Sequence, residues 1–257
     1  MALLSDGTKR EIKRAANFAG FLSLANQVEY WWGNRITSDH LSLYRPFISD
    51  QTVCFDIGAH YGRKTKLFRK LGARVVAVEP IADCCRKLRE LYANDPKTTI
   101  IERACGPSAG RATLRYCRLN PQNSAIAGSS REAPNAEDSN VLMTTLDALI
   151  GAHGIPSFCK IDCEGYERAV LRGLSSGIPA ISFEFHSSDV AGVESCTSQL
   201  IPLGNDRFNF TRGNVHRFIA SGWLTQAQLI AHVSAEPPET AGDIFALNEE
   251  LSSASRI

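Results

Sequence analysis

Hydrophobic residues recur along the chain with two periods, and these periods alternate from about residue 46 onward. Short apolar runs of the kind that form buried strands are each followed by a stretch with apolar positions at helical spacing. In the first half this pattern predicts strand 53–57, helix 62–71, strand 74–79, helix 81–94 and strand 98–104. Such a β-α-β-α-β order is typical of a parallel sheet with helices on its faces.

Residues 118–140 interrupt this alternation, because they are polar and show no period. We expect them to form a lid or a disordered loop. Beyond them the pattern predicts a strand leading into a helix over 141–150, a strand and a helix over 156–174, strand 179–186, helix 190–203, strand 207–211, helix 224–233 and strand 243–247. The alternation of strands and helices therefore predicts an α/β fold.

The length of the chain suits one large domain with an extension. Of 257 residues, 44% are hydrophobic, which is enough for a substantial core. Apolar positions at helical spacing precede the first strand. We therefore expect an N-terminal helical extension over 1–48 and a single α/β domain over 49–257.

The net charge limits which partners the protein can be expected to bind, and the cysteines indicate the redox state of its surroundings. A net charge of +1 gives no electrostatic case for nucleic acid or an anionic membrane. The first residues form neither the apolar core of a signal peptide nor a run that could cross a bilayer. The eight cysteines include no Cys-x-x-Cys pair, so we expect buried free thiols in reducing surroundings. These features favour a cytoplasmic protein and leave its oligomeric state open.

The segment VCFDIGAHYGRKT, residues 53–65, predicts a nucleotide site. Asp56 lies near the end of a strand, Gly58 and Gly62 follow in a turn, and Glu79 ends the next strand. Acids at the carboxyl ends of neighbouring parallel strands, with a glycine turn after the first, are typical of nucleotide-binding α/β sheets. Each residue also has a plainer interpretation, since Asp56 could cap a helix and the glycines could only turn the chain.

The spacing of the glycines favours one class of nucleotide. Dinucleotides usually bind at G-x-G-x-x-G, where the backbone approaches a pyrophosphate, whereas this turn reads D-x-G-x-x-x-G. S-adenosylmethionine has no phosphate. Its cationic amino-acid end suits Asp56, and its ribose hydroxyls suit Glu79, a carboxylate that would repel the 2′-phosphate of NADP. We expect S-adenosylmethionine as the cofactor, and a nicotinamide-dependent oxidoreductase is the rival interpretation.

Two later strands end in residues suited to catalysis. Methyl transfer to a hydroxyl needs positioned reactants and a base, and the candidates are Asp162, Glu164, Glu184 and His186. Strand alternation places Glu184 and His186 on the same side. The carboxylates could instead hold Mg²⁺, although we expect no metal. In plainer terms, Glu164 could be a first-turn helix acid and His186 a satisfied histidine at a strand end.

The segments VCFDIGAHYGRKT, RVVAVEP, TTLDALI, FCKIDCEGYERAVLRGL, ISFEFH and GDIFAL resemble the FkbM family of S-adenosylmethionine-dependent methyltransferases. The most specific of them is KIDCEGYE, which is similar to the family's K-I-D-V-E-G-x-E. The resemblance covers about residues 50–248. It implies a Rossmann-like class I methyltransferase fold, with a seven-stranded sheet whose last strand is antiparallel, and O-methylation of a hydroxyl on a sugar or natural product.

The same resemblance implies roles for individual residues. Asp162 and Glu164 would line the active site. The cofactor-binding residues that we expect are Asp56, Gly58, His60, Gly62, Glu79, Pro80 and Asp162. His60 departs from the family pattern, which commonly has Asn there. A non-catalytic relative that serves as a partner subunit is therefore a further alternative to an enzyme acting on a small molecule or a glycan.

Basic residues follow the glycine turn at Arg63, Lys64 and Lys66. Positive charge in the first turn of a helix opposes the helix dipole. We hypothesise that these residues meet an anionic part of the substrate, and a solvated helix face explains them equally well.

Overall fold

The computed structural model describes residues 36–117, 124–130, 136–213 and 215–254. Most of the expected helical extension, residues 1–35, lies outside the described residues. Among the residues described, no helix is long and apolar enough to cross a bilayer.

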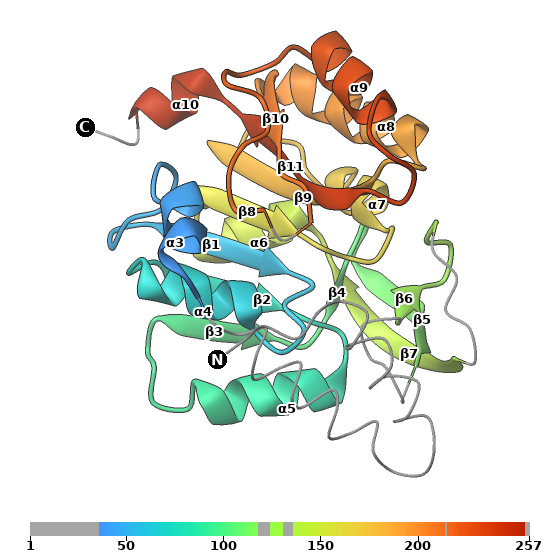
Figure 1. Ribbon diagram of the computed structural model, residues 1–257. Helices are drawn as coiled ribbons and strands as arrows, with labels where there is room; N and C mark the ends of the chain where they lie inside the picture. The colour runs from blue at the N-terminus through green and yellow to red at the C-terminus, as the bar shows by residue number, and fades with distance from the viewer. Residues whose placement is uncertain (1–35, 118–123, 131–135, 214, 255–257) are drawn as a thin grey trace, which may run out of the picture.

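The main sheet has seven strands in the order β10-β11-β9-β8-β1-β2-β3 (Figure 1). Its strands are β1 (Val53–Ile57), β2 (Arg74–Val78), β3 (Thr98–Ile101), β8 (Phe158–Ile161), β9 (Ala180–His186), β10 (Arg207–Phe210) and β11 (Ala241–Leu247). β11 runs antiparallel to both of its neighbours, β9 and β10, and the other neighbouring strands pair in parallel. Core clusters cover the interior strands of this sheet on both faces, which is why they read as hydrophobic runs in the sequence. The expected seven-stranded, mostly parallel sheet is confirmed.

Helices cover both faces of this sheet (Figure 1). They are α3 (Ser38–Tyr44), α4 (Arg63–Lys70), α5 (Ala82–Leu91), α6 (Leu146–His153), α7 (Glu167–Leu171), α8 (Val190–Leu200), the 3₁₀ turn η2 (Ile201–Leu203), α9 (Gln226–Ser234) and α10 (Glu249–Ala254). Side chains of α3 and α4 pack into one core cluster with one face of the strands. Side chains of α6, α7, α8 and α9 pack into a second cluster against the other face.

The chain ahead of β1 belongs to the same core as the sheet. Leu43, Tyr44 and Ile48 are buried, and the Tyr44 ring lies 5.4 Å from the ring of Phe158 in β8, centroid to centroid. Thr37 begins α3 by capping it, accepting a hydrogen bond from the backbone of His40. The described part of the expected extension therefore packs directly against the strands that form the site.

A second sheet of four strands stands beside the first. Its order is β4-β7-β5-β6, formed by β4 (Ala104–Cys105), β5 (Gly110–Tyr116), β6 (Ala125–Ile126) and β7 (Glu137–Thr144). The prediction of an irregular segment over 118–140 was therefore wrong for β6 and for the start of β7. The first four residues of β7 are polar and exposed, so they carry no hydrophobic pattern, and pairing along the whole of β5 makes them a strand.

Candidate active site

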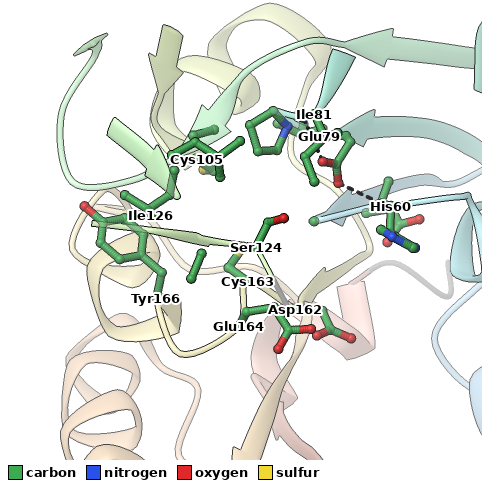
Figure 2. A pocket seen from close by; sticks show the side chains of 18 of the residues that line it. His60, Glu79, Ile81, Cys105, Ser124, Ile126, Asp162, Cys163, Glu164 and Tyr166 are labelled. Atoms are coloured by element: carbon green, nitrogen blue, oxygen red, sulfur yellow. Dashed lines mark hydrogen bonds between the residues drawn. The ribbon is translucent and has the colours of Figure 1, made fainter. Parts of the chain in front are cut away.

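A cavity of about 290 Å³ opens at the carboxyl ends of β1, β2, β8 and β9. In open α/β sheets this edge is where ligands bind. The predicted site residues that line it are Asp56, Gly58, His60, Glu79, Pro80, Asp162, Glu164 and Glu184. Two predicted residues, Gly62 and His186, are not among the lining residues. Figure 2 shows Asp162 and Glu164 on one side of the cavity, with Ile81, Cys105 and Ile126 on the other.

The glycine turn after β1 brings two strand ends into contact. Gly58 has φ +79°, and a Cβ there would lie 1.9 Å from the backbone oxygen of Asp162. Only glycine permits both that backbone conformation and that approach. Gly62, with φ +80°, packs against Leu88 instead, so its role is in the fold of the turn.

His60 also has a positive φ, of +49°. Non-glycine residues rarely adopt this conformation, but Asn, Asp and His adopt it more readily than others. The departure from Asn that the sequence shows at this position therefore preserves the backbone geometry. Burial lowers the pKa of His60 to about 4, so the ring is neutral near pH 7.

Glu79 is 3% exposed and accepts two backbone hydrogen bonds. Its Oε2 accepts from the N–H of His60 at 2.8 Å, and its Oε1 accepts from the N–H of Ile81 at 2.9 Å. Burial raises the pKa of Glu79 to about 7, although both hydrogen bonds lower it. Each carboxylate oxygen can accept more than one hydrogen bond, so this fixed carboxylate can still receive a pair of ligand hydroxyls.

Asp56 lies deeper than Glu79 and is 1% exposed. The Thr65 hydroxyl donates to its Oδ2 at 2.5 Å, which ties β1 to helix α4. Burial raises the pKa of Asp56 to about 6, against the lowering effect of that hydrogen bond. Asp56 thus has a structural partner as well as a place on the cavity wall.

The second sheet supplies an apolar wall to the cavity. Leu114 of β5, Ala125 and Ile126 of β6, and Ile81 ahead of α5 line it. Leu114, Ile126 and Ile81 belong to one buried cluster with Met143 of β7. Sequence reasoning missed this wall, because the segment that carries β6 has no recognisable period. The wall offers a flat ring an apolar surface beside the Glu79 carboxylate.

The turn after β8 is held in an unusual conformation. Glu164 has φ +53°, and the side chain of Glu167 accepts hydrogen bonds from the backbone N–H groups of Cys163 and Gly165, at 2.8 and 3.3 Å. The Ser129 hydroxyl, from the loop after β6, donates to the backbone oxygen of Glu164 at 2.6 Å. Glu167, the second glutamate of KIDCEGYE, thus stabilises the turn that carries Glu164, the first.

Three carboxylates meet at the floor of the cavity. One oxygen from each of Asp162, Glu164 and Glu184 lies within 4.8 Å of the others, a group of hard oxygens that could hold a divalent cation. His186 Nε2 lies 3.7 Å from Glu184 Oε2. The structure therefore brings three predicted catalytic residues to the cavity. His186 lies beside Glu184 but is not among the residues that line the cavity.

The basic residues of α4 have partners within the protein. Lys64 donates to the hydroxyl of Tyr44 at 2.6 Å and to Oδ2 of Asp243 at 3.3 Å. Arg63 Nη2 lies 3.2 Å from Nε2 of His40. Lys64 thus has a structural role, and both Arg63 and Lys64 also line the cavity, so the hypothesis of a contact with an anionic substrate stays a prediction. Lys66 is exposed and is not a cavity residue.

The order of the main sheet, its antiparallel β11 and the cavity beyond β1 and β2 define a class I methyltransferase fold. A family profile described as the methyltransferase FkbM domain matches residues 56–210. This chain belongs to the FkbM methyltransferase family.

Solved structures with a similar fold include three methyltransferases. An FkbM methyltransferase from Methylobacillus flagellatus KT is 15% identical at a TM-score of 0.48, and the match covers 77% of this chain and 44% of that one. A precorrin-6Y C5,15-methyltransferase from Geobacter metallireducens GS-15 is 13% identical at a TM-score of 0.44, covering 82% and 87%. A putative rRNA methylase from Clostridium thermocellum is 11% identical at a TM-score of 0.43, covering 84% and 99%. No curated protein matches the sequence.

Proposed function

We propose that this protein is an S-adenosylmethionine-dependent O-methyltransferase that acts on a hydroxyl of a small molecule or glycan. The observation that carries the proposal is one cavity that joins the buried carboxylate of Glu79, an apolar wall and a cluster of three carboxylates. Membership of the FkbM family supports methyl transfer. The net charge of +1 supports an acceptor other than nucleic acid. Eight free cysteines support the reducing environment of the cytoplasm.

The residues of the cavity fit the cofactor part by part. Glu79 would accept hydrogen bonds from the two ribose hydroxyls with the lone pairs that its backbone partners leave. Ile81, Leu114 and Ile126 would offer the adenine ring an apolar surface. Asp162 and the deeper Asp56 offer negative charge to the amino-acid end. When bound, the cofactor supplies an electrophilic methyl group on a sulfonium, so the protein has to position an acceptor and exclude water.

Glu184 is the residue that we assign as base. Its side chain is 21% exposed on a central strand, and it lines the cavity. Asp162 is less suited, because its Oδ2 is engaged by Lys160 at 3.2 Å. Glu184 would take the proton of the acceptor hydroxyl, and His186 beside it would pass the proton to solvent. The buried ammonium of Lys160 already offsets charge in the cluster, so the proposed reaction uses no metal.

Thermal unfolding with four ligands tests this proposal. A ligand at 100 times its Kd stabilises the native state by about 2.7 kcal/mol, which raises the Tm of a domain of this size by roughly 5–10 °C. We expect S-adenosylmethionine and S-adenosylhomocysteine to give such shifts and NAD and NADP to give none. Stabilisation by NAD alone would favour the oxidoreductase instead. A non-catalytic subunit would bind the cofactor but methylate nothing in a screen of hydroxylated acceptors.

A further inference from the structure

Lys160 is a charged residue in the middle of the protein. It lies on β8, whose four residues are all buried, and it is itself 0% exposed. Lysine is almost never fully buried unless it is paired. In the proposed reaction Lys160 offsets charge in the carboxylate cluster but moves no proton and touches no reacting group, so its place beside Asp162 calls for a further explanation.

The ammonium of Lys160 has three oxygen neighbours. It donates to Oδ1 of Asp243 at 2.7 Å and to the backbone oxygen of Ile161 at 3.2 Å, and it forms an ion pair with Oδ2 of Asp162 at 3.2 Å. Two of these three oxygens belong to the point where β8 ends and the active-site turn begins. The ammonium therefore fixes both the backbone and the side chain at that point.

The Asp243 carboxylate, which pairs with Lys160, also pairs with a second lysine, Lys64. Asp243 lies on the antiparallel strand β11, and its other oxygen is 3.3 Å from Nζ of Lys64, which also donates to Tyr44. Burial raises the pKa of Asp243, but the two ammonium groups lower it more, so the net direction is downward. Burial lowers the pKa of Lys160, and the carboxylates of Asp162 and Asp243 reverse this and raise it well above its ordinary value. Lys160 and Asp243 are therefore both charged, and Lys64, whose pKa is also raised, is charged as well.

The charges of this network do not cancel within it. Lys64 and Lys160 share the single carboxylate of Asp243, which leaves one positive charge. Asp162, whose side chain is 35% exposed at the cavity, lies next to Lys160 and balances that charge. The geometry thus joins a buried cation to a carboxylate that faces the ligand.

We infer that Lys160 is a positioning residue, which holds Asp162 in the orientation that binds the amino-acid end of the cofactor. This inference rests on the proposed function, because it assigns Asp162 a ligand. Stability alone does not explain Lys160, since buried ion pairs are often replaced by apolar groups without loss. Lys160→Met, moreover, leaves Lys64 and Asp243 as a balanced pair.

A double-mutant cycle on the full chain tests the inference. The variants are Lys160→Met, Asp162→Asn and the double variant, with S-adenosylhomocysteine affinity measured by calorimetry. Lys66→Met, on the exposed face of α4, is the matched control. We expect Lys160→Met to weaken binding about tenfold, and to have no further effect when Asp162 is already Asn. Lys160→Gln, which retains a donor, takes the place of Lys160→Met if that variant does not fold.

The outcomes separate three cases. A Lys160 variant with an unchanged Kd but a lower Tm overturns the inference, because Lys160 would then serve the fold only. The inference is also overturned if the fold-losses in affinity of the two single variants multiply in the double variant, because Lys160 would then act independently of Asp162. Absence of binding by the wild-type protein overturns the proposed function and this inference with it.

Discussion

Glu79 accepts a hydrogen bond from the backbone N–H of His60 at 2.8 Å, which joins the end of β2 to the turn after β1. Through this bond the turn conformation of His60 sets the orientation of the Glu79 carboxylate. The two predicted cofactor residues therefore form one unit rather than two separate contacts.

Removing the Glu79 carboxylate should abolish most of the cofactor affinity. Glu79→Ala loses two charge-assisted hydrogen bonds to ribose, each contributing about 1.5 kcal/mol, so we expect roughly 100-fold weaker binding of S-adenosylhomocysteine by calorimetry. Glu90→Ala, at an exposed position of α5, is the control and should bind as the wild type does. Equal affinity of Glu79→Ala and the wild type would remove Glu79 from the site.

The pH dependence of binding should report the same carboxylate. The pKa of Glu79 is about 7 in the cofactor-free protein, and the ionised form is the one that accepts both hydroxyls. Binding is therefore weak below pH 6 and strengthens as the pH rises through 7, by about tenfold between pH 6 and 8. Calorimetry across this range measures it. A flat profile for the wild type would show that Glu79 is ionised throughout or makes no contact.

Substitution of the proposed base should separate catalysis from binding. Glu184→Gln keeps the size of the side chain but cannot accept the proton, so we expect kcat to fall about 100-fold or more. The Kd of S-adenosylhomocysteine should stay within about threefold, given that the cofactor contacts are elsewhere. Glu194→Gln, an exposed residue of α8, is the matched control. Full activity of Glu184→Gln would transfer the role to Glu164 or Asp162.

Methyl transfer should continue without divalent cations. Lys160 supplies a positive charge 3.2 Å from Asp162, so the carboxylate cluster has a cation of its own. We expect the rate in excess EDTA to equal the rate with added Mg²⁺. Loss of activity in EDTA and its recovery with Mg²⁺ would place a metal among Asp162, Glu164 and Glu184 instead.

Gly58 should tolerate no side chain. In Gly58→Ala the new Cβ would lie 1.9 Å from the Asp162 backbone oxygen, in addition to the strain of a positive φ. Gly213→Ala is the control, because Gly213 has φ +45° with nothing within 4 Å of a Cβ. Strain of a positive φ costs roughly 1–2 kcal/mol in either variant, and we expect overpacking against Asp162 to lower the unfolding free energy of Gly58→Ala by about 2 kcal/mol more. Denaturant unfolding measures both, and equal losses would contradict the close contact.

The main sheet could be predicted because its strands are buried on both faces. The burial pattern of β8 is uniform, and the corresponding sequence is an apolar run that ends in Asp162. Acids at or near the ends of such strands also predicted the five acidic residues that line the cavity. The start of β7 in the second sheet could not be predicted in the same way, since Glu137–Asn140 are exposed and polar and become a strand only through pairing with β5.

The buried ion pair between Lys160 and Asp243 could not be predicted from the local sequence pattern either. Lys160 meets Asp243 across 83 positions of sequence, and no periodicity reports such a contact. A lysine inside an apolar strand was the one available signal. The structural role of Lys64 was missed for a similar reason, because its partner Tyr44 lies on a helix ahead of the sheet.

Calorimetric titration of the wild-type protein with S-adenosylhomocysteine tests the central claim most directly. The account predicts saturable binding with one molecule per chain, weakened roughly 100-fold in Glu79→Ala and unchanged in Glu90→Ala. Absence of heat with this ligand, together with saturable binding of NAD abolished by the same Glu79 substitution, would contradict it.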